Sequence, residues 1–248
     1  MTGHTVVSRQ EWLEARTAFL AKERSLTHQR DALLKERLEL PWERIDKNYV
    51  FTSTEGKQTL GDLFGDKSQL LIYHFMFGPE WEQGCSSCSM VADTFNPNLV
   101  HLTQRDVSLV AVSRAPIEKI VPFQKRMGWS FPWVSSFGSD FNFDYGVSFT
   151  KEQLATPKPY NFGTSPFPAD EAPGFSAFYK DEDGAVFHTY SGFARGVEGA
   201  LGVYTLLDLV PKGRDEDALP HPMAWVRHHD RYEAAKPKQV AECCHAEA

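Results

Sequence analysis

The sequence predicts an α/β fold, because buried strands alternate with helices near its middle. "QLLIYHFMF", residues 69–77, and "VSLVAVS", residues 107–113, are apolar runs of strand length, typical of parallel strands that are buried on both faces. A helical stretch, "CSMVADTFN", lies between them. A second helix is expected in "PIEKIVPFQKRMG", where Pro116 and Glu118 suit a first helical turn. The order strand, helix, strand, helix indicates a βαβ unit.

Charge and composition exclude several classes of protein. The 248 residues include 26 Lys and Arg against 33 Asp and Glu, a net charge of −7, which argues against nucleic acid as a partner. The first residues lack a signal-peptide pattern, and no segment approaches the roughly 18 apolar residues of a membrane span. Four cysteines are too few for a secreted disulfide framework. We therefore expect a cytoplasmic protein without a membrane partner.

The amino-terminal region is expected to be helical. In "SRQEWLEARTAFLAKERSLTHQRDALLKERLEL", residues 8–40, Ser8 and Glu11 have the spacing of a capping box, and large apolar residues follow at helical spacing. The stretch predicts one or two amphipathic helices, which form an extension over residues 1–42. Such helices pack on the core or on a second subunit, so a homo-oligomer formed through them is one of the expectations.

The main domain is predicted over residues 43–212. "YVFTSTEGKQTLGDLF" predicts a short leading hairpin around Glu55-Gly56. The aromatic stretch "FPWVSSFGSDFNFDYGVSF" favours core packing over a pocket lining. Residues 151–172, which are rich in proline and lack periodicity, predict a long surface insertion.

The end of the domain reads as a hairpin and a helix. "PGFSAFYKDEDGAVFHTYSGF" predicts two antiparallel strands that flank a turn at Asp183-Gly184. "GVEGALGVYTLLDLV", residues 196–210, predicts one final helix. Residues 213–248 are expected to form a C-terminal extension and a flexible tail.

The order of these elements resembles the thioredoxin-like superfamily over about residues 45–210. The leading hairpin and the aromatic segment are similar to those of its peroxiredoxin branch. The strings "FGPEWEQGCSSCS", "VAVSRAP", "KRMGW" and "MAWVRHHDRY" resemble a bacterial family of this superfamily, domain-of-unknown-function family 899. The resemblance implies a central mixed sheet flanked by helices.

The resemblance also implies a role for a proline. Pro173 aligns with the cis-proline that faces the cysteine pair in thioredoxin-like proteins, and Ala172 would then offer its backbone to an extended substrate. Trp81 together with Pro173 would shape the docking surface. The alternative is an ordinary trans proline at the start of an edge strand.

Cys85 and Cys88 lie where the first buried strand gives way to a helix. A cysteine in the first turn of a helix meets unpaired N–H groups and the positive end of the helix dipole, which favour the thiolate. Cys85 is therefore the candidate nucleophile. Cys88, one turn further, is placed to attack a mixed disulfide and is the candidate resolving thiol.

The surroundings of the pair depart from the patterns of known relatives. Ser86-Ser87 replaces the Gly-Pro of thioredoxin, and Glu80 and Glu82 oppose thiolate formation if they face Cys85. The Pro and Thr that precede the peroxidatic cysteine of peroxiredoxins are not at their expected spacing. We predict a thiol–disulfide oxidoreductase that acts on a protein or small-molecule disulfide or thiol and needs no organic cofactor, with a thiol peroxidase as a weaker alternative.

A soft-metal protein is the main rival, because Cys-x-x-Cys also serves metal sites. Copper-delivery members of the superfamily add a distant histidine. His188 is the available analogue, so Cys85, Cys88 and His188 would bind copper or zinc unless alternation along the strand buries the histidine. A third possibility is an interaction module that keeps the fold without the chemistry. The tail offers further soft ligands, which are incidental if it is unstructured: Cys243, Cys244 and His245.

Three other side chains carry open alternatives. Arg114 follows a strand at its carboxyl end, where it either holds an anionic substrate, lowers the pKa of Cys85 or forms a structural salt bridge. His228 and His229 are expected to point to different sides of their segment, which favours a solvated or interface role. His74 is expected to be a buried strand residue.

Overall fold

The structure, a computed structural model, describes residues 3–233 and divides the chain into two units, Met1–Glu43 and Arg44–Ala248. The first unit contains one helix, α1 (Arg9–Leu38), where one or two were predicted. Its capping box is confirmed: the Glu11 N–H donates to Ser8 Oγ at 3.3 Å, and the Ser8 N–H donates to Glu11 Oε2 at 2.9 Å. These bonds satisfy N–H groups that a helix start otherwise leaves without partners.

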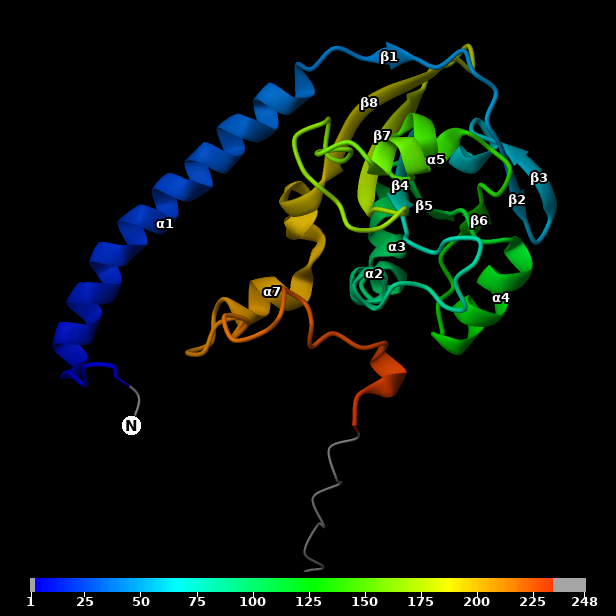
Figure 1. The fold of residues 1–248 in the computed structure, drawn as a ribbon. Coiled ribbons are helices and arrows are strands. Elements are labelled where there is room, and N and C mark those ends of the chain that lie inside the picture. The colour runs from blue at the N-terminus through cyan, green and yellow to red at the C-terminus, as the bar shows by residue number, and fades with distance from the viewer. Residues whose placement is uncertain (1–2, 234–248) are drawn as a thin grey trace, which may run out of the picture. The chain divides into compact units, whose positions relative to one another are not determined.

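An eight-stranded sheet runs through the second unit in the order β1-β8-β7-β4-β5-β6-β2-β3 (Figure 1). The central strand β4 pairs in parallel with β5 and antiparallel with β7, while β6 continues the parallel part beyond β5. The predicted mixed sheet is therefore confirmed. Its strands are β1 (Glu43–Arg44), β2 (Val50–Ser53), β3 (Gly56–Thr59), β4 (Gln69–His74), β5 (Val107–Ser113), β6 (Trp133–Ser135), β7 (Gly174–Lys180) and β8 (Val186–Phe193).

Helices cover both faces of this sheet. The α-helices are α2 (Ser86–Ala92), α3 (Phe95–Gln104), α4 (Ile117–Arg126), α5 (Phe141–Asp144), α6 (Lys151–Leu154) and α7 (Gly202–Leu207). Short 3₁₀ helices add η1 (Asp62–Phe64), η2 (Ala194–Ala200) and η3 (His229–Arg231). The predicted βαβ unit is confirmed, with α2 and α3 connecting the parallel strands β4 and β5.

Alternation along β4 divides the buried side chains between two cores. Leu70 and Ile72 belong to the core on one face, which we call the α5 face because α5 packs there. Tyr73 belongs to the core on the other, which we call the α2 face; that core includes residues of α2, α3 and α4. Because successive strand residues point to opposite faces, a strand that is buried on both sides is expected to be apolar on both, as Leu70, Leu71 and Ile72 of β4 are.

The predictions of one final helix and of a surface insertion both need correction. The helix expected over residues 196–210 is interrupted: η2 ends at Ala200, Leu201 has φ −87° and ψ 72°, and α7 starts at Gly202. Closely spaced glycines such as Gly196 and Gly199, which are poor helix formers, account for the break.

The insertion at residues 151–172 is also not confined to the surface. Tyr160 is only 2% exposed, and its hydroxyl donates to the Pro173 carbonyl and accepts the Ala194 N–H at 2.9 Å.

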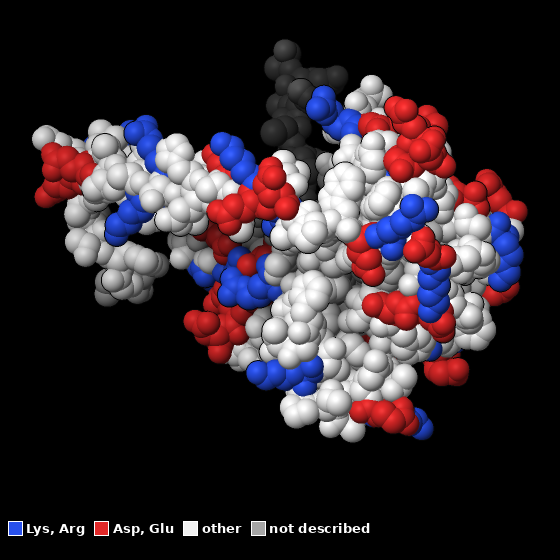
Figure 2. Space-filling model, turned by 90° about the horizontal axis from the view of Figure 1, so that it is seen from above, with Lys and Arg blue, Asp and Glu red and all other residues white. Residues whose placement is uncertain are grey.

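The described residues give no sign of a membrane span or of a uniformly basic surface. No helix among residues 3–233 combines the length and apolarity that crossing a bilayer requires. On the face seen in Figure 2, acidic and basic side chains of the body are interspersed.

Candidate functional site

Cys85 lies directly before α2, where three hydrogen bonds fix its backbone. The Cys85 N–H donates to the Met76 carbonyl at 3.0 Å. The Cys85 carbonyl accepts the N–H of Ser89 at 3.0 Å and the Ser89 hydroxyl at 2.8 Å. Cys85 is the N-cap residue of α2, so its position at the start of a helix is as predicted.

The two thiols are reduced in this structure and occupy different environments. Cys85 is partly exposed, and Cys88 is buried. The Cys88 thiol donates a hydrogen bond that lowers the pKa of Cys85 to about 7, against the opposing effect of burial, and N–H groups of α2 and the Ser87 hydroxyl add to the lowering. Burial raises the pKa of Cys88 well above its usual value. Negative charge that the pair carries near neutral pH therefore resides on Cys85 and not on Cys88.

Tyr73, the last residue but one of β4, lies against this pair. Burial raises the pKa of Tyr73 well above its usual value, so the hydroxyl stays protonated and can donate. Its hydrogen bond to the Cys88 sulfur acts to lower the pKa of Cys88, against the larger effect of burial. Tyr73 was not singled out from the sequence, because a tyrosine within an apolar strand is expected to be an ordinary core residue.

Gly84, which precedes Cys85, occupies a place that has no room for a side chain. A Cβ atom there would lie 2.5 Å from Phe75 Cε1 and 2.9 Å from Phe123 Cε1. The Gly84 carbonyl accepts a hydrogen bond from His228 Nε2 at 2.8 Å. Glycine is therefore required by this close approach, which positions the residue next to the nucleophile.

Both cysteines line a cavity of about 690 Å³, which we call the cysteine cavity. Its walls come from β4, α2, the insertion, the η2–α7 segment and the C-terminal extension. The lining residues are Tyr73, Met76, Cys85, Ser87, Cys88, Val91, Phe167, Pro168, Pro173, Ala194, Arg195, Val197, Glu198, Leu201, Tyr204, Arg214, Glu216, His221, Pro222 and Met223.

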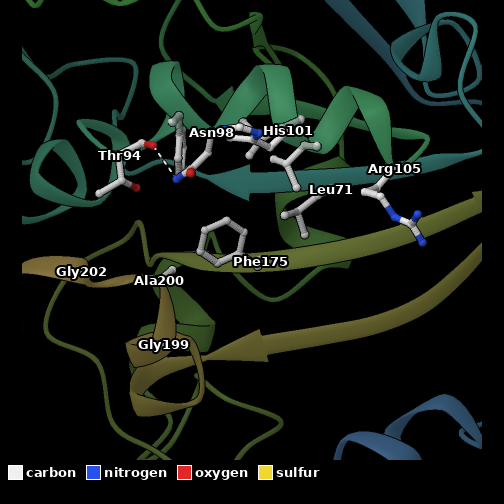
Figure 3. A pocket seen from close by; sticks show the side chains of 12 residues that line it. Leu71, Thr94, Asn98, His101, Arg105, Phe175, Gly199, Ala200 and Gly202 are labelled. Atoms are coloured by element: carbon white, nitrogen blue, oxygen red, sulfur yellow. Dashed lines mark hydrogen bonds between the residues drawn. The ribbon is translucent and has the colours of Figure 1, made fainter. Parts of the chain in front are cut away.

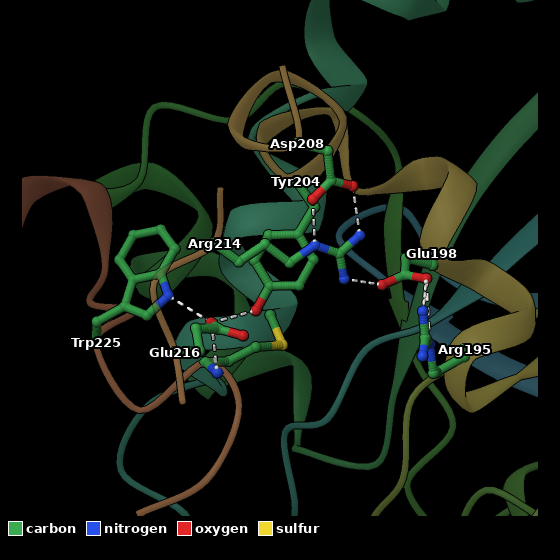
Figure 4. A network of polar contacts seen from close by, with 8 residues as sticks. Arg195, Glu198, Tyr204, Asp208, Arg214, Glu216 and Trp225 are labelled. Atoms are coloured by element: carbon green, nitrogen blue, oxygen red, sulfur yellow. Dashed lines mark hydrogen bonds and ion pairs between the residues drawn. The ribbon is translucent and has the colours of Figure 1, made fainter. Parts of the chain in front are cut away.

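A polar network braces the wall that follows η2 (Figure 4). Arg214 donates to both carboxylate oxygens of Asp208 at 2.7 Å and also to Glu198. Glu198 in turn accepts from Arg195 Nη2 at 3.0 Å. Figure 4 shows the Arg214 guanidinium lying between the two carboxylates. The network ties η2 to the residues after α7.

Glu216 joins three parts of the same wall. One of its oxygens accepts the Tyr204 hydroxyl at 2.6 Å, the Met223 N–H at 2.9 Å and the Trp225 indole N–H at 2.6 Å. Tyr204 also packs with Met90 of α2 and with Val226. The C-terminal extension is thus built into the site, a role that the prediction of an extension and flexible tail did not include.

The segment around η3 closes against the loop before α2. His228 Nδ1 accepts from Arg126 Nη2 at 3.0 Å, which leaves the proton on Nε2 for the Gly84 carbonyl. His229 Nδ1 contacts Asp93 Oδ1 at 2.7 Å. The two histidines go to different partners, as predicted, but the solvated role favoured for them was wrong for His228, which is buried. Burial lowers the pKa of His228.

Pro173 lines the cysteine cavity, but the cis-proline expectation was wrong. The described residues contain no cis peptide bond. The Ala172 N–H donates to the Val147 carbonyl at 2.8 Å, and Ala172 is buried. The N–H before Pro173 is therefore occupied within the protein and is not free to pair with an extended substrate.

Trp81 and Arg114 lie outside the cavity lining. Trp81 is partly buried against the α2-face core. Arg114 forms an ion pair with Glu171 at 2.7 Å, and its guanidinium lies 4.5 Å from the ring centre of Phe143. Burial raises the pKa of Glu171 to about 7, against the lowering effects of the Ser148 hydroxyl and Arg114. Of the three roles considered for Arg114, this geometry matches the salt bridge.

His188 takes part in a chain of hydrogen bonds on the α5 face. Its Nε2 contacts Ser191 Oγ at 2.8 Å, Ser191 contacts Ser176 at 2.8 Å, and Ser176 contacts His74 Nε2 at 2.7 Å. His74 is buried, as predicted, and burial lowers its pKa to about 3, with a smaller contribution from His188.

The set of metal ligands considered from the sequence is not assembled. Among residues 3–233, no group of three or more His, Cys, Asp or Glu side chains is arranged to hold a metal ion. The tail side chains named as further soft ligands, Cys243, Cys244 and His245, lie outside the described residues.

A second cavity, of about 590 Å³, lies between α3 and the sheet (Figure 3). Leu71 and Phe175 contribute apolar side chains from β4 and β7, and His101 and Arg105 belong to the α3 side. None of its lining residues is a cysteine. Gly199, Ala200 and Gly202 border it, so the η2–α7 segment separates the two cavities.

The topology defines the class of protein. A central strand flanked by one parallel and one antiparallel neighbour, followed by a helix that begins at a cysteine, is the thioredoxin-like fold. Within that class, the chain belongs to the family described as "Bacterial protein of unknown function (DUF899)", which matches it over residues 1–232. No curated protein matches the chain in sequence.

Several solved structures are similar to this chain at low identity. Peroxidoxin BcpB from Mycobacterium tuberculosis is 15% identical over 64% of this chain and 92% of its own, with a TM-score of 0.40. A peroxiredoxin Q from Xanthomonas campestris is 17% identical over 67% of this chain and 95% of its own, with a TM-score of 0.41. A peroxiredoxin-like protein from Aquifex aeolicus is 15% identical over 60% of this chain and 72% of its own, with a TM-score of 0.39.

Proposed function

We propose that this protein is a thiol–disulfide oxidoreductase of a reducing compartment such as the cytoplasm, with Cys85 as nucleophile and Cys88 as resolving thiol. The observation that carries the proposal is the difference between the two sulfurs. Cys85 has a pKa near 7 and reaches the cavity, whereas burial keeps Cys88 protonated. A pair that acts in sequence needs this asymmetry, because only the first thiol should be charged before substrate arrives.

The reaction proceeds in two exchanges. The Cys85 thiolate attacks one sulfur of the substrate; a Cys85–substrate bond forms, the substrate S–S bond breaks, and the first half leaves as a thiolate. Cys88 gives up its proton to that leaving group and attacks Cys85, which forms the Cys85–Cys88 disulfide and releases the second half as a thiolate. Two electrons pass from the pair to the substrate, and no organic cofactor takes part.

Each residue around the pair has a role in this scheme. The Cys88 thiol stabilises the Cys85 thiolate before attack, and Ser87 adds a further hydrogen bond. The Tyr73 hydroxyl stabilises negative charge on Cys88 when Cys88 becomes the attacking group. Ser89 and Met76 hold the Cys85 backbone, so the exchange between thiol and disulfide is expected to involve mainly side-chain rotation.

The test uses a variant in which Cys243 and Cys244 are replaced by Ser, so that only the pair can react. After mild oxidation, mass spectrometry of the digest should find Cys85 joined to Cys88. With a disulfide substrate, Cys88→Ser should accumulate a mixed disulfide on Cys85, and the matched variant Cys85→Ser should accumulate none. Alkylation of Cys85 should increase with pH around a midpoint near 7. Two free thiols after oxidation would overturn the proposal.

A further inference from the structure

We infer that the cysteine cavity accepts small disulfides with uncharged, apolar substituents in preference to protein disulfides and anionic small disulfides. This inference rests on the proposed function and names its class of substrate. Three features of the cavity support it: the position of Cys85, the apolar lining and the state of the charged groups in the wall.

The position of Cys85 does not suit a protein substrate. Cys85 is only partly exposed and opens into a cavity rather than onto a flat surface. A protein disulfide would need a segment of backbone to approach beside Pro173, but the Ala172 N–H already donates to the Val147 carbonyl. The N–H that an extended chain would pair with at this position is therefore occupied. A small molecule that enters the cavity meets neither obstacle.

The side chains around the thiols are mainly apolar. Such a lining binds a substrate by removing apolar surface from water and provides few partners for polar substituents. The apolar side chains of this lining come from parts of the chain that lie far apart in sequence. They are Met76, Val91, Phe167, Pro168, Val197, Leu201 and Met223.

The arginines of the wall already form ion pairs with carboxylates of the same wall. Arg214 uses both Nη atoms and Nε on Glu198 and Asp208, and Arg195 pairs with Glu198. The members of this network that line the cavity are two cations, Arg195 and Arg214, and two carboxylates, Glu198 and Glu216, so the lining offers no surplus cation. An anionic disulfide would have to displace a carboxylate from an arginine or remain without a counter-charge, so the wall disfavours it.

The test compares two aromatic disulfides that differ in charge: neutral dithiodipyridine and dithiobis(nitrobenzoate), which carries two carboxylates. Both release a coloured thiol, so single-turnover rates can be followed directly at pH 7. Each rate is divided by the rate for a short cysteine peptide, which removes the intrinsic reactivity of the probe. We expect the corrected preference for the neutral probe to be about tenfold, which corresponds to about 1.4 kcal/mol, because the carboxylates of the anionic probe meet only arginines that are already paired.

Variants of the wall separate charge from overall folding. Glu198→Gln releases Arg195 and Arg214 and should reduce the preference for the neutral probe several-fold. Glu182→Gln removes the same charge from the exposed hairpin turn and should leave the preference unchanged. Alkylation by iodoacetamide should proceed at the wild-type rate in Glu182→Gln, and dividing the probe rates of each variant by its own alkylation rate removes any change in the reactivity of Cys85.

The outcomes distinguish this inference from the proposed function. If no probe produces a Cys85–Cys88 disulfide, the proposed function fails. If the disulfide forms but the corrected preference is absent, or if glutathione disulfide, a protein disulfide or the dication cystamine reacts faster than the neutral probe, the substrate inference alone is overturned. A Glu198→Gln variant with undiminished preference would remove the wall from the explanation.

Discussion

Tyr73 and His74 are neighbours at the end of β4, and they serve opposite faces of the sheet. Tyr73 contacts the reactive pair on the α2 face, where Cys85 reaches a cavity. His74 bonds to Ser176 on the α5 face, in a chain that continues through Ser191 to His188. Its ring stacks near Tyr145, with centroids 6.0 Å apart. The same strand thus supplies one polar group to an open site and another to a sealed core.

The difference shows where reactive chemistry can be accommodated. On the α5 face, His74 Nε2, Ser176, Ser191 and His188 bond to one another, which stabilises the fold and leaves these groups unavailable to ligands; His74 Nδ1 is buried without a partner among the described residues. On the α2 face, the partly exposed thiolate keeps access to solvent while its neighbours hold its charge. Substitutions on the α5 face should therefore change stability and leave thiol chemistry intact, whereas those on the α2 face should change thiol chemistry.

The largest stability effect is expected for Arg114→Met, which leaves the buried Glu171 without its cation. At pH 8, where Glu171 is ionised, the free energy of unfolding should fall by about 3 kcal/mol. The loss should be smaller at pH 6, because the carboxyl group can protonate. Urea unfolding measures both values, with Arg114→Lys as the conservative control. Slower alkylation of Cys85 in Arg114→Met would contradict the separation of the two faces.

Gly84→Ala tests the α2 face by steric crowding. The added methyl group would meet Phe75 and Phe123, and overpacking of this kind should cost about 2 kcal/mol of stability. The shift should also move Cys85 and raise the pH midpoint of its alkylation. Gly138→Ala, at a position with open space around it but a positive φ, should lower stability through backbone strain without moving that midpoint. An unchanged midpoint in Gly84→Ala would show that its packing is not coupled to the thiol.

Acid should act mainly through the α5 face. In the unfolded chain His74 binds a proton below its usual pKa of 6.5, whereas in the folded protein it does so only near pH 3. The contribution of His74 to the free energy of unfolding should therefore decrease by about 1.4 kcal/mol for each unit that pH falls between these values. His74→Phe, which keeps a ring beside Tyr145, should make this dependence shallower. A slope equal to that of wild type would be incompatible with a neutral buried His74.

The smallest effect is expected for Tyr73→Phe. Loss of the hydroxyl raises the pKa of Cys88 further, so the second exchange should slow about threefold, equivalent to about 0.7 kcal/mol, while the first exchange keeps its rate. Rapid quenching followed by mass spectrometry would detect the longer-lived mixed disulfide. Tyr49→Phe, which removes a hydroxyl bonded to Asp144 on the α5 face, is the matched control. Equal lifetimes in the two variants would exclude a role for Tyr73 in resolution.

The fold was largely predictable because its signals are local. The apolar runs of β4 and β5, the Asp183-Gly184 turn of the last hairpin and the capping box of α1 each depend on residues close in sequence. The final helix was mispredicted because the prediction followed the helical spacing of its apolar residues and gave too little weight to the closely spaced glycines that interrupt it. Propensity and periodicity disagreed there, and the backbone followed propensity.

The cysteine pair was predictable, but its cavity was not. Cys85 and Cys88 are identified by their spacing and by the strand before them, both local features. The wall depends on contacts between distant residues, such as Glu216 with Tyr204 and His228 with Gly84. No periodic pattern marks residues 213–232, and only the family resemblance of "MAWVRHHDRY" pointed to them. For Pro173, the family resemblance correctly predicted a position beside the cavity but wrongly predicted a cis peptide bond.

The origin of the cavity wall has a consequence for protein synthesis. A ribosome produces Cys85 well before it produces Arg214 and Met223, and domains fold as their residues emerge. A nascent chain that ends near residue 212 would therefore contain both thiols without the wall that limits access to them. Coverage of Cys85 is among the last properties that the growing polypeptide acquires, and premature termination would release a protein whose thiols lack this wall.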